Sequence, residues 1–172
     1  MAIWDPWRGC HRYSEGCKFC YIHKGDAKRG VDTNQITQTE KFYAPIVRKK
    51  NGEYKMKSGL VYVCFSSDFL LEDADPWRQE CWDMIRQRQD CQFLFLTKRI
   101  ERFMDCVPSD WGDGWDNVIV GCTVENQQRA DERLDGNTCV CYTGSKGGME
   151  YETEVRVFRK TRQDLRRSIP GG

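Results

Sequence analysis

Three short apolar runs, each followed by a helical pattern, restrict what this chain can fold into. The apolar runs cover residues 60–65, 93–96 and 118–120, and the helical patterns cover residues 77–88, 100–107 and 127–134. Because strands that alternate with helices form parallel sheets with right-handed crossovers, the pattern predicts an α/β fold. Since the runs are continuously apolar rather than alternating, we expect strands that are buried on both faces.

Polar side chains follow each apolar run, where the predicted strands end. The residues at the three exits are Ser66, Ser67 and Asp68, then Thr97, Lys98 and Arg99, then Thr123, Glu125 and Asn126. The carboxyl ends of parallel strands meet at one edge of a sheet, where ligands bind in α/β proteins. Polar residues also simply begin loops, but three such exits in succession favour a shared ligand site.

A cysteine cluster precedes the first apolar run. Cys10, Cys17 and Cys20 have the spacing C-x6-C-x2-C. Three thiolates in so short a segment can bind one metal centre and leave one coordination position open. A four-iron cluster held in this way keeps one iron free for a substrate or cofactor, and Phe19 is an aromatic side chain that can lie against a bound adenine.

Zinc is the alternative metal for the same loop. His23 follows Cys20 at a C-x2-C-x2-H spacing, so that Cys10, Cys17, Cys20 and His23 would form a closed Cys3His set, and His11 is a further candidate ligand. A closed tetrahedral zinc site would make the loop a structural staple rather than a reactive centre. The spacing alone leaves both metals open.

Composition limits the class of protein. The chain has 172 residues, which suits one domain or one domain with a tail, and a net charge of +1, which gives no support for a nucleic-acid or membrane partner. There is no apolar run long enough to span a membrane and no signal peptide at the N-terminus, so we expect a cytoplasmic protein. Ten cysteines in such a protein do not indicate a disulfide framework. Those in apolar segments, which are Cys64, Cys81, Cys91, Cys106 and Cys122, are predicted to be buried free thiols.

An excursion precedes the first predicted strand. Asn51-Gly52 lies between two short segments of residues 47–50 and 53–56. An Asn-Gly pair is typical of a type I′ turn, so we predict a small hairpin at about residues 45–57.

The cysteine loop resembles that of radical S-adenosylmethionine (SAM) enzymes, in which an aromatic residue precedes the last cysteine, as Phe19 precedes Cys20 here. The first gap, of six residues, is longer than the usual three. The chain more closely resembles a phage- and prophage-associated family of radical-SAM-like proteins of unknown function. The blocks that carry this resemblance are residues 4–10, 14–17, 20–21, 66–69, 96–99, 121–126 and 130–133.

The resemblance implies a partial (β/α) barrel of the radical SAM type with a [4Fe-4S] cluster and SAM. Cys10, Cys17 and Cys20 would bind the cluster, and Phe19 would flank SAM. The residues that would line the site are Ser66, Ser67, Asp68, Thr97, Lys98, Thr123, Glu125 and Asn126. A carboxylate and an amide suit hydroxyl and ammonium donors, so Glu125 and Asn126 are candidates to bind the ribose or amino group of SAM.

The resemblance covers about residues 3–135, and we expect a domain at residues 1–135 with its cysteine loop at 7–24. Residues 136–172 form an atypical tail without a further strand–helix unit of the expected kind, so the barrel looks truncated. A partial barrel exposes a sheet edge, which favours an oligomer or a covering partner.

Two functions follow from these alternatives. The first is a radical SAM-like enzyme that cleaves SAM reductively, with an electron donor as partner and an unknown substrate, and truncation would make it inactive. The second is a zinc-stapled, non-catalytic phage-associated binding module. Nucleic-acid binding through aromatic residues and the basic tail is disfavoured by the near-neutral charge.

Overall fold

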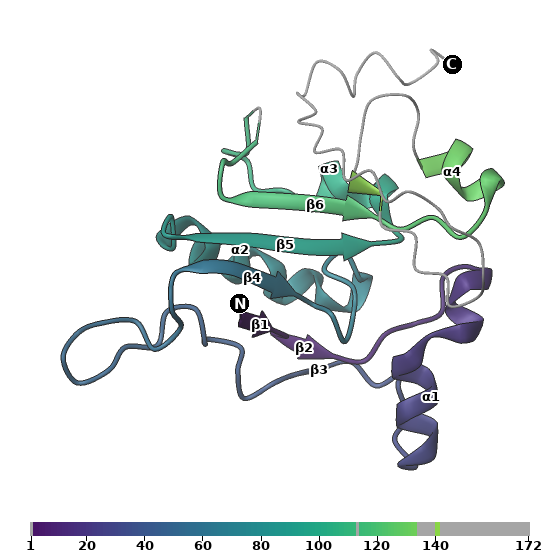
Figure 1. The fold of residues 1–172 in the computed structure, drawn as a ribbon, viewed down its shortest axis with the longest axis horizontal. Helices are drawn as coiled ribbons and strands as arrows, with labels where there is room; N and C mark the ends of the chain where they lie inside the picture. Colours follow the sequence, from purple (N-terminus) through teal and green to yellow (C-terminus); the bar gives the residue numbers. More distant parts are fainter. Residues whose placement is uncertain (1, 113, 134–139, 142–172) are drawn as a thin grey trace.

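A five-stranded parallel sheet organises the chain (Figure 1). The computed structural model describes residues 2–112 and 114–133 and the backbone of residues 140–141. In spatial order the strands are β1 (Ala2–Trp4), β4 (Gly59–Val63), β5 (Cys91–Thr97), β6 (Val118–Cys122) and β7 (Val140–Cys141). The predicted α/β class with parallel strands is confirmed. Within the described residues β1 and β7 are the two edges of the sheet, and they do not pair to close a barrel. The predicted tail at 136–172 lies outside the described residues, apart from β7.

One face of the sheet forms the core. Val61 pairs with Phe93 and Val63 pairs with Phe95, and all four side chains are fully buried. Burial of apolar side chains such as these is the main favourable term in the free energy of folding. Helix α2 (Asp75–Gln87) lies behind β4 and β5 in Figure 1 and contributes buried side chains to the same core.

The other face of the sheet is only partly covered, which corrects the expectation of strands buried on both faces. Along β5 the residues alternate, with Phe93 and Phe95 buried and Leu94 and Leu96 partly exposed. Tyr62 of β4 and Ile119 of β6 are also partly exposed. A continuous apolar run therefore predicts that both faces of the sheet are apolar. It does not predict that described residues cover both faces.

The predicted helices exist, with bounds that differ from the expected ones by one or two residues. The pattern at 77–88 is α2, which has Pro76 in its first turn. The pattern at 100–107 divides into a 3-10 turn, η3 (Ile100–Arg102), and a single α-helical turn, α3 (Phe103–Cys106). The pattern at 127–134 is α4 (Gln127–Arg133). A further 3-10 turn, η2 (Glu72–Ala74), leads into α2.

The N-terminal segment contains strands that the sequence pattern did not reveal. β1 adds to the sheet beside β4, and β2 (Trp7–Arg8) pairs antiparallel with β3 (Thr37–Gln38). These strands have two or three residues, which is too short for a periodicity to be visible.

The hairpin expected near residues 45–57 is present as one antiparallel bridge between Arg48 and Tyr54, but its turn type differs from the prediction. Gly52 has φ +86° and its N–H donates to the Lys49 carbonyl at 3.0 Å, while Asn51 is not in the left-handed region. A type I′ turn needs both central residues at positive φ, so the prediction of that turn was wrong. Gly52 is instead the last residue of a turn over residues 49–52, and it has the left-handed conformation.

The predicted burial of the scattered cysteines is confirmed. Cys64, Cys81, Cys91, Cys106 and Cys122 are all buried. No helix of the described part is long and apolar enough to cross a membrane.

Candidate functional site

The cysteine loop lies across the carboxyl ends of the sheet strands. It leads from β2 through the 3-10 turn η1 (Glu15–Phe19) into α1 (Tyr21–Lys28). In Figure 1 the arrowheads of β4, β5 and β6 point toward the side where this loop and α4 are found. The loop and the strand exits, predicted separately, therefore lie together.

The three candidate metal ligands lie on this one loop as free thiols. Cys17 is buried, and Cys10 and Cys20 are partly exposed. Backbone hydrogen bonds fix all three: the Cys10 N–H donates to the Thr33 carbonyl at 2.8 Å, the Cys17 N–H to the Ser14 carbonyl at 2.9 Å and the Cys20 N–H to the Cys17 carbonyl at 3.2 Å. The Tyr13 N–H also points to the Cys17 sulfur at 3.5 Å.

Cys10 is chemically distinct because its surroundings favour the neutral thiol. Burial, followed by the nearby Asp68 carboxylate, raises the pKa of Cys10 to about 12, although the Arg99 guanidinium opposes the shift. A bound cation reverses this preference, because metal ligation needs the thiolate.

The donor set fits a metal by its chemistry, since three unpaired thiols on one loop are the usual ligands of iron–sulfur clusters. Within the part of the chain that the structure describes, however, no group of three or more His, Cys, Asp or Glu side chains is arranged to hold a metal ion. His23, the fourth ligand in the zinc interpretation, is buried on α1. The loop thus brings suitable ligands together in sequence, and their side chains would have to turn toward one another to bind.

Asp68 links the first two strand exits. Its carboxylate accepts hydrogen bonds from the Thr97 hydroxyl at 2.8 Å and from the Lys98 N–H at 3.1 Å. Arg99 forms an ion pair with the same carboxylate at 3.2 Å, and its other terminal nitrogen donates to the His11 carbonyl at 3.1 Å. Asp68 and Arg99 therefore fix both the strand exits and the start of the cysteine loop.

Glu125 links the third exit to the cysteine loop. It accepts a hydrogen bond from the Ser14 hydroxyl and pairs with Lys98 at 3.1 Å and with Arg133 at 2.7 Å. Burial by itself raises the pKa of Glu125, but the Ser14 hydrogen bond and the charges of Lys98 and Arg133 outweigh burial and lower the pKa below its usual range. The carboxylate is ionised at neutral pH and is already occupied by protein groups.

Asn126 and helix α4 bind Glu15, which follows Ser14 in the cysteine loop. Asn126 donates a hydrogen bond to Glu15 at 2.6 Å, and Arg129 pairs with the same carboxylate at 3.0 Å. The Arg129 and Asn126 hydrogen bonds, the first being the larger, hold the pKa of Glu15 at about 2. In this structure Glu125 and Asn126, proposed above to contact SAM, are engaged with the cysteine loop.

The remaining candidates divide between loop contacts and free surface. Ser67 donates its hydroxyl proton to the Gly9 carbonyl, and the Ser66 N–H bonds to Asp5 at 3.2 Å. Thr123 accepts a hydrogen bond from Lys98 at 3.0 Å. Phe19 is 70% exposed, and the ammonium groups of Lys18 and Lys24 lie over its ring at 5.9 and 5.6 Å from the centroid.

Sequence reasoning missed Tyr13 and Arg133, which complete this site, and it named Arg99 at a strand exit without assigning it to the site. The guanidinium groups of Arg99 and Arg133 both lie over the Tyr13 ring, at 4.9 and 5.5 Å from its centroid. Arg133 is buried, and its Nη2 has no hydrogen-bond partner among the described residues. Both arginines were in blocks that carried the family resemblance, so a signal for them was present. Nothing in the sequence singled out Tyr13.

The comparisons with known proteins give a family without an activity. No curated protein matches the chain, and no solved structure matches it. The description of the matching family names neither radical SAM chemistry nor phage. The match spans residues 1–139, and the chain therefore belongs to the family described as "Protein of unknown function (DUF5131)".

Proposed function

We propose that the protein is a radical SAM-like iron–sulfur enzyme whose sheet is a portion of a (β/α) barrel. Cys10, Cys17 and Cys20 would hold a [4Fe-4S] cluster. The observation that carries the proposal is the position of the cysteine loop, because contacts from Asp68, Arg99 and Glu125 attach it to the carboxyl ends of parallel strands. Ligand sites of α/β proteins are built at that edge.

When bound, the cluster and SAM would supply one-electron reductive cleavage of SAM and hydrogen abstraction from a substrate. The chain would contribute binding and orientation. Phe19 offers an exposed aromatic face beside Cys20 for an adenine, and Arg133 offers a buried N–H that a ligand carboxylate would satisfy. Lys98 and Thr123 are further polar groups at the same rim.

The test begins with anaerobic reconstitution of the full chain with iron and sulfide. The proposal expects a brown protein with about four iron atoms per chain, bleached by dithionite, that then converts SAM to 5′-deoxyadenosine. Cys10→Ser, Cys17→Ser and Cys20→Ser should each lose the colour, whereas Cys106→Ser, at a buried cysteine outside the loop, should keep it. A colourless wild-type protein, or loop variants that retain full iron, would contradict the proposal.

Zinc remains the second candidate because Cys17, Cys20 and His23 follow one another at intervals of three residues through η1 and α1. In that case the loop is a structural staple of a non-catalytic binding module, and a chelator should unfold it. His23→Ala separates the two functions. It should release stoichiometric zinc from a zinc protein and leave the iron content of an iron–sulfur protein unchanged.

A further inference from the structure

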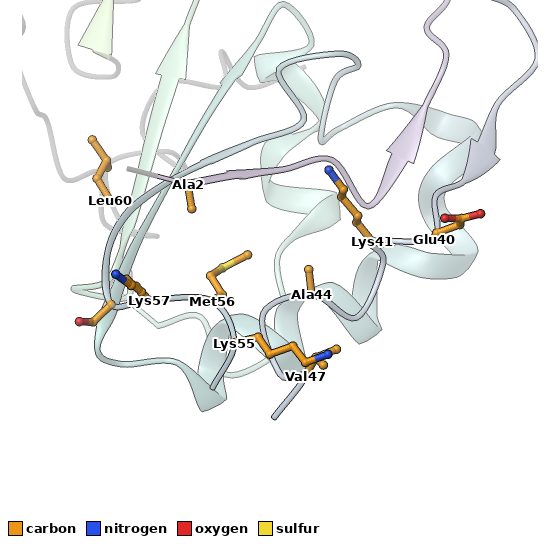
Figure 2. A pocket seen from close by; sticks show the side chains of 10 residues that line it. Ala2, Glu40, Lys41, Ala44, Val47, Lys55, Met56, Lys57 and Leu60 are labelled. Carbon is orange, nitrogen blue, oxygen red and sulfur yellow. The ribbon is translucent and has the colours of Figure 1, made fainter. Parts of the chain in front are cut away.

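A cavity lies at the opposite end of the sheet from the cysteine loop. It has a volume of about 480 Å³ and opens beside Ala2 at the start of β1 and Leu60 near the start of β4 (Figure 2). Pockets that bind small organic ligands typically have volumes of ~300–1,000 Å³. The cavity is therefore large enough for a small molecule, and it shares no residue with the candidate site at the carboxyl rim.

The centre of the cavity is apolar. Figure 2 shows the side chains of Ala2, Ala44 and Met56 pointing toward the same space. Met56 is only partly buried, and it also packs against the hydrophobic core together with Ala2 and Ala44. Methionine is unbranched and polarisable, so it adapts to an apolar ligand of variable shape.

The edge of the cavity is cationic. Lys41, Lys55 and Lys57 line it together with one carboxylate, Glu40, and all three lysines are exposed. None of the three forms an ion pair with a carboxylate in the described part of the chain, whereas Lys49 pairs with Glu53 at 3.0 Å and Lys98 with Glu125 at 3.1 Å. The lining thus carries an excess of positive charge next to an apolar floor.

We propose that this cavity binds a small amphipathic carboxylate. The apolar body would lie on Met56, Ala2 and Ala44, and the carboxylate would lie at the positively charged rim formed by Lys41, Lys55 and Lys57, whose exposed side chains run in different directions around the opening (Figure 2). The apolar floor favours burial of a hydrocarbon, and the unpaired lysines favour an anion over a neutral or cationic molecule of the same shape. This inference is independent of the metal chemistry proposed for the other end of the sheet.

The full chain labelled with ¹³C at its methionine methyl groups provides a direct test, with octanoate as the probe. Octanoate should shift the Met56 methyl resonance saturably and leave Met84, which is 1% exposed in the core, unchanged. The Met56→Leu variant assigns the resonance. The neutral 1-octanol and the cationic octylammonium ion have the same chain length and should bind more weakly.

Charge variants complete the test. Replacing Lys41, Lys55 and Lys57 together by Gln should weaken octanoate binding by up to about tenfold, because the positive rim is lost and each exposed charge contact contributes ~0.5 kcal/mol. Lys50→Gln, in the exposed turn of the hairpin and outside the cavity, should leave binding unchanged. The proposal is overturned if octanoate does not move Met56, if 1-octanol binds as tightly as octanoate, or if the triple variant binds like the wild type.

Discussion

Asp68 is the residue on which the rim of the sheet most depends. Its side chain is 7% exposed and that of Arg99 is 4% exposed, so their ion pair at 3.2 Å is buried. Taking both charges out of water costs free energy, and hydrogen bonds from Thr97 and the Lys98 and Leu70 N–H groups offset part of that cost. Removing Asp68 leaves the buried Arg99 charge with one partner among the described residues, the exposed carboxylate of Glu72 at 3.4 Å.

Asp68→Asn should therefore destabilise the protein by up to about 3–5 kcal/mol, because the Arg99 charge loses its buried partner and keeps, within the described part of the chain, only its ion pair with the exposed Glu72. The free energy of unfolding in urea measures the effect. Asp83→Asn is the matched control, since Asp83 is 47% exposed in its pair with Arg86, and it should cost no more than ~1 kcal/mol. Equal effects of the two variants would show that the Asp68–Arg99 pair has no special role.

Glu125 predicts a pH dependence at the same rim. Its pKa is lower in the folded protein than its ordinary value of 4.5, so its ionised form stabilises the fold above about pH 4.5. That contribution should disappear as the pH falls through the lower folded pKa. The thermal midpoint of the wild type should exceed that of Glu125→Gln most at pH 7, and the difference should shrink below pH 4.5. A difference that is constant from pH 7 to pH 3 would contradict this assignment.

For these residues, the sequence predicted the position in the fold better than it predicted the contact partners. Parallel strands bring their exits together, so the proximity of Asp68, Lys98 and Glu125 could be predicted. The contacts of Glu125 with Ser14 and of Glu15 with Arg129 join residues 111 and 114 positions apart, and no local pattern encodes such pairs. Residue chemistry alone suggested a ligand for Glu125, whereas the structure gives it a protein neighbour.

Among the elements, the cysteine loop is the one whose packing leaves least room for change. A Cβ atom on Gly16 would lie 2.1 Å from Glu125 Cγ, which is far inside van der Waals contact. Glycine is therefore required at residue 16 by space, and the φ of Gly16 is not in the left-handed region. Any side chain there would push the loop away from Glu125.

Gly16→Ala should thus destabilise the protein by ~1–3 kcal/mol, the usual cost of overpacking, and should lower metal uptake by the loop. Gly25→Ala is the matched control within α1, where the nearest atom to the added Cβ lies 4.0 Å away. That substitution should stabilise the helix by about 0.5–1 kcal/mol. Urea unfolding of both variants decides the matter, and a neutral Gly16→Ala would show that the loop is not seated on Glu125.

Long elements were predicted well from the sequence and short ones were not. The strands β4, β5 and β6 and helix α2 each have enough residues for their apolar pattern to be visible. β1 and β2 have no such pattern, because their two or three residues gain structure from neighbours distant in sequence. The Asn51-Gly52 pair suggested a turn correctly and its type wrongly, since the same dipeptide fits more than one hairpin loop.

Across the whole molecule, an aromatic cluster joins the cysteine loop to the core. The Phe69 ring contacts Trp7 at 5.5 Å, Trp82 of α2 at 5.1 Å and Phe95 of β5 at 4.7 Å between centroids. Phe69 follows the first strand exit and is fully buried. Its ring therefore connects the N-terminal segment, the sheet and α2.

Phe69→Ala should cost about 3–5 kcal/mol and should lower the unfolding midpoints seen by circular dichroism and by tryptophan fluorescence together. Phe19→Ala, at a side chain that is 70% exposed, should change stability by no more than ~0.5 kcal/mol. Two separated transitions in the wild type would show that the aromatic cluster does not couple these regions.

The hydrogen bond between Ser14 and Glu125 has a consequence for the order of events during synthesis of the protein. The thiols leave the ribosome early, but the carboxylate that seats their loop lies 111 positions later in the chain. At about 5–20 residues per second, translation of that interval lasts roughly 6–22 s. During that time the cysteine loop of the nascent chain lacks the carboxylate that holds it in place. Assembly of any metal centre must therefore follow synthesis of the sheet, or rely on a factor that protects the thiols until then.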